Sequence, residues 1–535
     1  MTRWRVAPLA AVLLAAPNLP AQVPLFDDLG HHHLAVTTAT PRAQQYFDQG
    51  LRLTWGFNHA EAIAAFREAA RLDPNCALCA WGEAYALGPN INAAMDSAAG
   101  VAAYQAIQRA LSLASRGTPV EQALIGALSR RYAATPPADR AALDSAFARA
   151  MADVVRRFPD HLEAATVYAD ALMNLSPWNY WEKGGSPRPD AATIVRQLER
   201  VVAANPNHPG ACHLYIHAVE AAHPEKAVAC AERLAGLMPG AGHVVHMPAH
   251  IYIRVGRYAD AVTANHHAIH TDESYIADRR PEGVYPLAYY PHNYHFLAFA
   301  ANLAGDSKTA IDAARAVASK VPVEVARNVP FAEGIPAYAH LALVTFGRWD
   351  DVLAQPMPPA ELLVAHGLAS YARGVAHAAQ GHPAEAAADL ENVRRAAAAQ
   401  LAARGPQWPT NKALDIAVHA LAGEIALRAQ RFGEAVEHFQ AGVSIEDGMQ
   451  YEEPPLWYYS LRQSLGVALL GAGRAAEAEA AYREDLVKFP ENGWSLYGLA
   501  QALRAQGKSA DAGAMDARFK RAWAGADVTL TASRF

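Results

Sequence analysis

Small and apolar residues recur every three or four positions along most of the chain, as on one face of a helix, and the pattern repeats at intervals of about 34 residues. One unit near the start contains Gly50, Ala62, Phe66, Ala69 and Pro74. The small residues let two helices approach closely, the aromatic side chain fills the space between them, and the proline ends the second helix. The pattern therefore predicts pairs of antiparallel helices from residue 41 onward.

The same frame returns in the C-terminal third of the chain. It contains Gly374 and Ala386; Gly423, Ala435 and Phe439; Gly466, Ala478, Tyr482 and Pro490; and Trp494, Gly498 and Ala510. This spacing resembles the tetratricopeptide repeat (TPR). One helical pair cannot cover its own apolar face, so successive pairs stack and enclose a concave groove. We predict an all-α fold, a TPR-like α-solenoid superhelix of about twelve helical hairpins.

The predicted repeats divide the chain into segments. We assign residues 1–21 to a signal peptide and 22–40 to an N-terminal extension. N-terminal TPR-like hairpins with an aromatic insert (Ser176–Gly185) occupy 41–206, central histidine-rich repeats 207–322, and C-terminal TPR-like repeats 323–535. A second insert, Thr271–Tyr290, reads as a long connection. Long inserts in repeat proteins are often functional, and this one could fold over the groove as a lid.

The N-terminus has the features of a secretory signal. Arg3 and Arg5 precede an apolar run, Ala7–Ala16, and small residues before Gln22 favour cleavage after Ala21. An uncleaved anchor is the alternative. Because no later run reaches the roughly 18 apolar residues of a membrane helix, we expect no membrane span after cleavage. The mature protein is predicted to be periplasmic or secreted.

Length and net charge limit the classes of function that the chain can have. The 535 residues are 52% hydrophobic and carry a formal net charge of −6. A chain of this size buries a large core. A chain with a net negative charge has no excess of basic residues to attract a polyanion, so we do not predict nucleic-acid binding.

The four cysteines fit an oxidising compartment. Cys212 and Cys230 flank a predicted turn at equal heights, which makes a disulfide between them geometrically reasonable. Cys76 and Cys79 are expected to form a local disulfide or a structural pair. A zinc knuckle would require a second cysteine pair, and haem attachment would require a histidine after Cys79.

Seven histidines in the central repeats carry the strongest chemical signal. They occur three or four residues apart, so that each group lies on one face of a helix. The three groups are His213 and His217; His243, His246 and His250; and His292 and His295. Counting from Ala261 and Ala310 as the twentieth positions of their repeats, the last two groups occupy positions 2, 5 and 9. In TPR arrays these positions face the groove, so the resemblance implies that three repeats direct imidazoles into one cavity.

Clustered neutral imidazoles are good ligands for transition metals, and the all-nitrogen set favours zinc or copper. Three or four histidines suffice for one ion, so seven could hold two ions, or one ion and a free proton-transfer group. A metal-dependent oxidoreductase or hydrolase acting on a small molecule or peptide in the groove is one possibility. The alternative is a periplasmic TPR scaffold that binds a protein or peptide through these histidines, without catalysis.

Other candidate site residues are chosen because they lie close to this histidine cluster in the sequence. Arg254 follows His250 by one helical turn and could bind an anionic substrate, and Tyr289 and Tyr290 could contact it from the insert. The His31–His33 triplet could bind metal, but a mobile mature terminus explains it equally well. The remaining histidines are expected to be hydrogen-bonded or solvated, as single histidines usually are. They include His59, His208, His223, His266, His267, His270, His340, His382 and His438.

Several longer motifs resemble a bacterial family of exported TPR-like proteins. They are F-x-x-G-L-x-L-x-x-G-F-N-H-A-E-A-I at Phe47–Ile63, G-H-V-V-H-M-P-A-H-I-Y from Gly242, Y-P-H-N-Y-H-F from Tyr290, and P-P-L-W-Y-Y-S-L-R-Q-S-L-G at Pro454–Gly466. The resemblance covers nearly the whole mature chain. It implies the fold and the export, and no particular activity.

Overall fold

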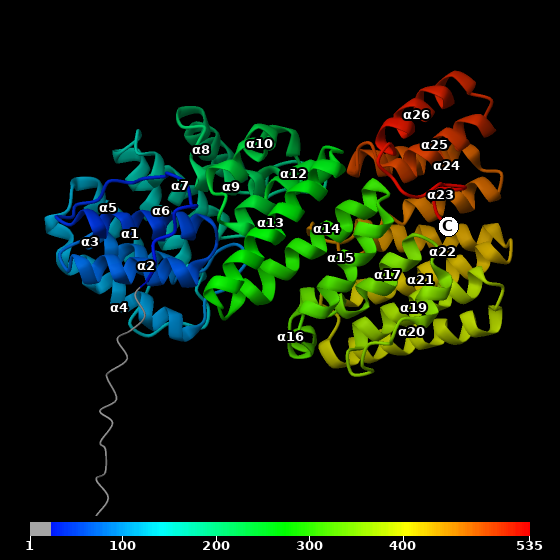
Figure 1. Cartoon of the computed structure of the whole chain (residues 1–535), viewed down its shortest axis with the longest axis horizontal. Coiled ribbons are helices and arrows are strands. Elements are labelled where there is room, and N and C mark those ends of the chain that lie inside the picture. The colour runs from blue at the N-terminus through cyan, green and yellow to red at the C-terminus, as the bar shows by residue number, and fades with distance from the viewer. Residues whose placement is uncertain (1–22) are drawn as a thin grey trace, which may run out of the picture.

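The protein's structure, a computed structural model, describes residues 23–535, and within them the chain runs through successive pairs of antiparallel helices (Figure 1). The predicted signal peptide, residues 1–21, lies outside the described residues. No helix among residues 23–535 is long and apolar enough to cross a membrane.

Twelve helical pairs follow one another along the described chain, which confirms the predicted TPR-like solenoid. The first six pairs are α1 (Pro41–Trp55) with α2 (His59–Leu72), α3 (Ala77–Ala86) with α4 (Ser97–Leu113), α5 (Pro119–Leu128) with α6 (Ala141–Arg157), α7 (Leu162–Met173) with α8 (Ala191–Ala204), α9 (Pro209–Val219) with α10 (Val228–Leu237), and the broken helix α11 (Gly242–His246) and α12 (Pro248–Arg254) with α13 (Tyr258–Arg279). The other six are α14 (Tyr290–Ala304) with α15 (Ser307–Lys320), α17 (Tyr338–Thr345) with α18 (Trp349–Ala354), α19 (Leu363–Ala379) with α20 (Pro383–Arg404), α21 (Asn411–Arg428) with α22 (Phe432–Asp447), α23 (Arg462–Gly471) with α24 (Ala475–Lys488), and α25 (Gly493–Ala505) with α26 (Ser509–Ala522). A short helix, α16 (Val323–Asn328), connects α15 to the eighth pair.

The repeat pattern follows from close contacts between helices. Phe66 is fully buried between α1 and α3, and a β-carbon added at Gly50 or Gly82 would lie 2.8 Å or 2.4 Å from its ring. Only glycine lets both backbones approach the ring this closely. Tyr482 takes the equivalent place in the C-terminal repeats.

The two predicted inserts differ in structure. The aromatic insert is irregular, and the indole N–H of Trp181 ties it to α9 by donating to the Ala218 carbonyl at 2.7 Å. Thr271–Tyr290 is mostly helical, so its interpretation as a long connection was wrong. α13 continues to Arg279, and the π-helix η4 (Tyr285–Tyr289) leads directly into α14. No proline or glycine interrupts the first part of this stretch before Pro281, which allows the helix to continue.

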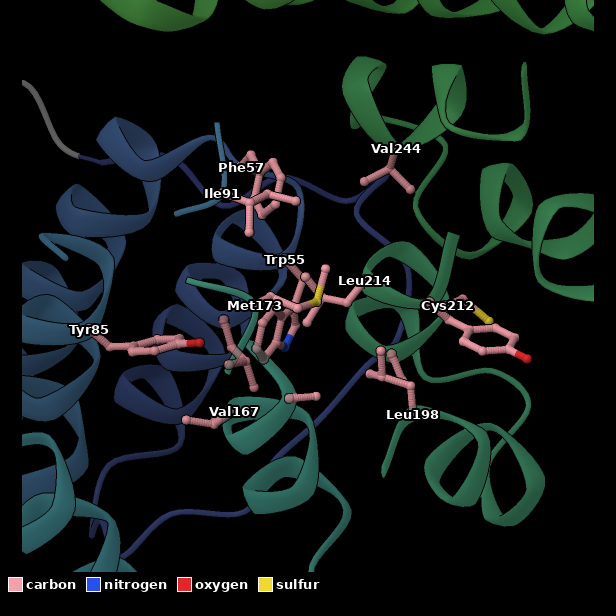
Figure 2. Close-up of a cluster of buried hydrophobic side chains, with 14 of the residues drawn as sticks. Trp55, Phe57, Tyr85, Ile91, Val167, Met173, Leu198, Cys212, Leu214 and Val244 are labelled. Atoms are coloured by element: carbon pink, nitrogen blue, oxygen red, sulfur yellow. The ribbon is translucent and has the colours of Figure 1, made fainter. Parts of the chain in front are cut away.

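The N-terminal half turns tightly enough for the first repeat to contact the fifth through α1 and α9. Figure 2 shows Trp55 at the centre of this turn, close to Met173 and Leu214. The N-terminal extension lies along α1, where the Tyr46 hydroxyl donates to the Val23 carbonyl at 2.7 Å. The inside of this turn is therefore a hydrophobic core built from several repeats.

The C-terminal hairpins return to contact the central repeats (Figure 1). The Arg254 guanidinium donates to the Lys488 carbonyl at 3.0 Å, and the Tyr258 hydroxyl donates to the Pro490 carbonyl at 2.7 Å. The indole of Trp494 donates to the carbonyl of Asn302 at 3.0 Å. These contacts join repeats that are more than 190 residues apart in the sequence.

The cysteines divide into one bonded pair and two free thiols. Cys76 and Cys79 form a disulfide at the start of α3. The disulfide considered for Cys212 and Cys230 is absent, since both are free and buried. The Cys212 thiol donates instead to the Pro206 carbonyl at 3.6 Å.

Candidate metal centre

Three histidines from α9 and α11 form one group, and their ligand nitrogens lie within 4.8 Å of one another: His213, His217 and His243. The Nδ1–H of His213 donates to the Trp55 carbonyl at 2.6 Å, because a carbonyl can only accept. In the same way His217 donates to the Glu220 carboxylate at 2.9 Å. Both Nε2 atoms therefore carry a free lone pair, and both are buried without a hydrogen-bond partner. Both nitrogens of His243 are also buried and unpartnered.

A second group, from α11, α12 and α14, consists of His246, His250 and His292. The Nδ1–H of His246 donates to the side-chain oxygen of Asn265 at 2.7 Å. The Asn265 amide nitrogen donates to the Ala261 carbonyl, which fixes the orientation of the amide. His250 donates through Nδ1 to Glu220 at 2.6 Å. These two imidazoles are thus also held with their Nε2 lone pairs free.

The Nε2 atoms of His246 and His250 lie 2.9 Å apart. Two lone pairs at this distance repel each other unless a cation, either a proton or a metal ion, lies between them. Ligands bound at about 2.0 to 2.1 Å from one ion, with angles of 90° to 109°, are separated by roughly 2.9 to 3.4 Å. The spacing therefore fits two ligands of one transition metal ion.

Glu220 connects the two groups. Its side chain is fully buried, and its two carboxylate oxygens accept from His217 and His250, one in each group. Burial alone would raise the pKa of this carboxyl group, but its electrostatic interactions and hydrogen bonds with His250 and His217 outweigh burial and lower the pKa to about 2. Such carboxylate–histidine pairs orient metal ligands and make them more basic.

Aromatic rings enclose the imidazoles. The Phe57 ring centroid lies 4.5 Å from that of His213, and the Trp178 centroid lies 4.9 Å from that of His217. On the other side, Phe296 lies 4.4 Å from His250. Phe57 and Trp178 have φ angles of 56° and 62°, in the left-handed region that bulky residues rarely adopt. The turn between the two helices of other repeats has the same left-handed conformation, for example at Gly256, Gly305 and Gln430, so the repeat geometry accounts for the φ of Phe57.

Five of the six grouped histidines are shielded from solvent and His292 is partly buried, whereas the sequence predicted an open groove lined by histidines. His213, His217, His243, His246 and His250 are each at most 2% exposed. The tight N-terminal turn brings Phe57 over one group. On the other side, the loop before α23 brings the Tyr451 hydroxyl to 3.4 Å from Glu220 and 2.6 Å from Glu453.

Burial also controls protonation. Desolvation, with the repulsion of neighbouring imidazoles, lowers the pKa of His213, His243, His246 and His292 far below 6.5. At neutral pH these side chains are uncharged, the state in which imidazole binds a metal.

The remaining predicted site residues lie at different distances from this centre. Tyr289 is buried with its ring centroid 4.6 Å from that of His243. His295 belongs to neither group and packs against Tyr338, with centroids 4.3 Å apart. The Tyr290 hydroxyl donates to Glu273 at 3.0 Å.

Arg254 uses its guanidinium to hold the backbone. It donates to the carbonyls of Glu220, Ala221 and Lys488 at 3.2, 3.4 and 3.0 Å. Its proposed contact with an anionic substrate stays a prediction. Met247 is buried in the core.

His32 and His33 both contact carboxylates, so the interpretation of this stretch as a mobile terminus was wrong; metal binding there stays a prediction, since the ligand atoms of His32, Glu163 and His208 lie within 4.8 Å of one another. His32 and His208 both contact the buried carboxylate of Glu163, at 2.9 and 3.2 Å. His208 Nδ1 accepts from the Ala211 backbone N–H at 3.1 Å, so its Nε2 carries the proton that faces Glu163. His208 is therefore a hydrogen-bonded structural residue. The sequence gives no sign of this cluster, because its members come from three distant segments.

Comparisons with known proteins add only general information. No family model matches the chain, and no curated protein matches it. Among solved structures, it is similar to the human IFIT1 dimer with m7Gppp-AAAA (11% identity, 91% of each chain covered, TM-score 0.30). It is also similar to yeast Tom70 (12% identity, 91% of this chain and 92% of that chain covered, TM-score 0.27). The fold assignment rests on the helical pairs of this chain.

Proposed function

We propose that this protein binds a transition metal, copper or zinc, through the six histidines of the two groups. The observation that carries the proposal is the orientation of the imidazoles. Four of them donate through Nδ1 to a fixed acceptor and turn an Nε2 lone pair inward, and two of these lone pairs are 2.9 Å apart. A protein core avoids unpaired buried polar atoms, so imidazole lone pairs gathered in two such groups favour metal binding.

The proposal includes export. The signal-like N-terminus and the Cys76–Cys79 disulfide support a periplasmic or secreted protein. The protein would then fold and bind its metal outside the cytoplasm. Intact mass spectrometry of the exported protein tests this, since cleavage after Ala21 predicts a chain that begins at Gln22.

Elemental analysis of tag-free protein tests metal binding. Wild-type protein expressed with both metals available is expected to contain stoichiometric copper or zinc. His217→Ala is expected to reduce the metal content, because it removes one ligand and one hydrogen bond to Glu220. His295→Ala is the matched control, since His295 is a partly buried histidine one helical turn from His292 but outside both groups.

Wild-type protein that contains neither metal, and does not take up either when titrated, would refute the proposal. The alternative of a TPR-like scaffold that binds a protein or peptide would then be favoured.

A further inference from the structure

We infer that the centre holds a pair of copper(I) ions, one in each histidine group, and that the pair binds dioxygen. The inference rests on the proposed metal binding and goes beyond it by giving the number of ions, their charge and the substrate. Three features of the site carry it: the division into two groups, the shortage of negative charge, and the exclusion of water.

The histidines form two sets of three. The ligand nitrogens of each set lie within 4.8 Å of one another, which is close enough for small side-chain movements to bring them to one ion. The sets are adjacent, since the ring centroids of His217 and His250 are 5.3 Å apart and those of His243 and His246 are 5.9 Å apart. Three protein ligands leave one position open on each ion, and the open positions of neighbouring ions can share a small ligand.

Charge favours monovalent ions. All six ligands are neutral imidazoles, and Glu220 is the carboxylate hydrogen-bonded to them. Two divalent ions would leave a buried net charge of roughly +3 (4 − 1), whereas two copper(I) ions leave roughly +1 (2 − 1), and buried uncompensated charge is costly. Zinc has no monovalent state in proteins, whereas copper(I) is stable with such ligands.

The surroundings favour a small apolar substrate. Five of the six histidines are at most 2% exposed, and Phe57, Trp178 and Phe296 cover the imidazoles. A hydrolytic reaction needs a water molecule and a polar substrate at the ions, and this enclosure hinders both. Dioxygen is small and uncharged and can diffuse through transient gaps in such a core.

The binding step is balanced without any further reactant. Each copper(I) ion gives one electron to dioxygen and becomes copper(II). Dioxygen keeps its O–O bond and becomes a peroxide that bridges the two ions, and no proton is taken up or released. Glu220 helps to hold His217 and His250 in place while the charge on the ions increases.

The experiment is anaerobic titration of the apoprotein with copper(I), followed by exposure to a known amount of dioxygen. We expect two copper ions per chain, one dioxygen consumed per copper pair, and no electron paramagnetic resonance signal, because the two copper(II) spins are coupled through the peroxide. His292→Ala is expected to bind one copper and to consume no dioxygen as a pair. His295→Ala, on the same helix, is expected to behave as wild type.

The outcomes separate this inference from the proposed function. One copper per chain in the wild type, or two copper ions that do not consume dioxygen, would overturn the inference and leave metal binding intact. Zinc bound in preference to copper(I) would do the same. If neither copper nor zinc binds, both proposals fail. Circular dichroism of each variant shows whether a loss of copper reflects a loss of fold.

Discussion

Replacing Glu220 with glutamine tests the link between the two histidine groups. The carboxylate accepts from His217 and His250 at 2.9 and 2.6 Å and is fully buried. Glutamine has nearly the same shape, but it has one oxygen and an NH2 group. One imidazole N–H therefore keeps an acceptor, and the other faces a second donor.

The expected cost follows from these contacts. A buried donor without an acceptor costs about 1 to 3 kcal/mol. The remaining hydrogen bond loses its charge assistance, which is about 1 kcal/mol more. The free energy of unfolding of the apoprotein should therefore fall by about 2 to 4 kcal/mol. Loss of a partner that orients a metal ligand typically reduces affinity about 10- to 100-fold, and here both groups lose one.

Urea denaturation of the apoprotein and competition with a chelator measure the two effects. Glu453→Gln is the matched control, because Glu453 accepts from Tyr451 at 2.6 Å and no histidine donates to it in the structure. The control should keep metal affinity close to wild type. Equal metal affinity in Glu220→Gln and wild type would refute the idea that this carboxylate orients ligands in both groups.

Three other predictions concern stability. Four histidines of the centre have strongly lowered pKa values and stay neutral in the folded apoprotein, while in the unfolded chain they take up protons below about pH 6.5. From pH 7.5 to 5.5 these four groups alone should lower the free energy of unfolding by about 5 kcal/mol. Urea midpoints measure the fall, and a flat profile would contradict this contribution. Gly210→Ala places a β-carbon 2.4 Å from the Trp55 ring and should lower the free energy of unfolding by about 1 to 3 kcal/mol, whereas Gly236→Ala meets nothing within 4 Å and should not lower the melting temperature. Arg254→Ala removes the hydrogen bond to the Lys488 carbonyl and two others, and should lower the free energy of unfolding by about 1 to 3 kcal/mol. Thermal or chemical denaturation measures this change. An unchanged midpoint would mean that the contact between distant repeats adds no stability.

The helical pairs could be predicted because they depend on local spacing. Gly50 and Phe66 are sixteen residues apart in one unit, and their contact is repeated along the chain. Helical periodicity placed the histidines in three stripes, one for each repeat, whereas the structure divides six of them into two adjacent sets, because His243 joins His213 and His217 while His246 and His250 join His292. The seventh, His295, is one turn from His292, but its ring turns toward Tyr338.

Contacts between distant segments could not be predicted from spacing. Phe57 reaches the centre because the first repeat meets the fifth, and Tyr451 reaches it from the C-terminal loop. The residues around Phe57 and Tyr451 in the sequence do not indicate which distant residues these side chains contact. The same reason explains why the groove was expected to be open, and why the ordered contact of His32 with Glu163 was missed.

The contact between the C-terminal hairpins and the central repeats affects the order in which parts of the protein fold during synthesis. In an ordinary solenoid each repeat depends only on its neighbours, so a partly synthesised array already has its finished shape. Here Tyr451, which reaches Glu220, and the carbonyls of Lys488 and Pro490, which accept from Arg254 and Tyr258 of the central repeats, emerge about 200 residues after the histidines. A chain that stops before them would present the imidazoles to water and to any competing ion, so the final enclosure is a late step in assembly.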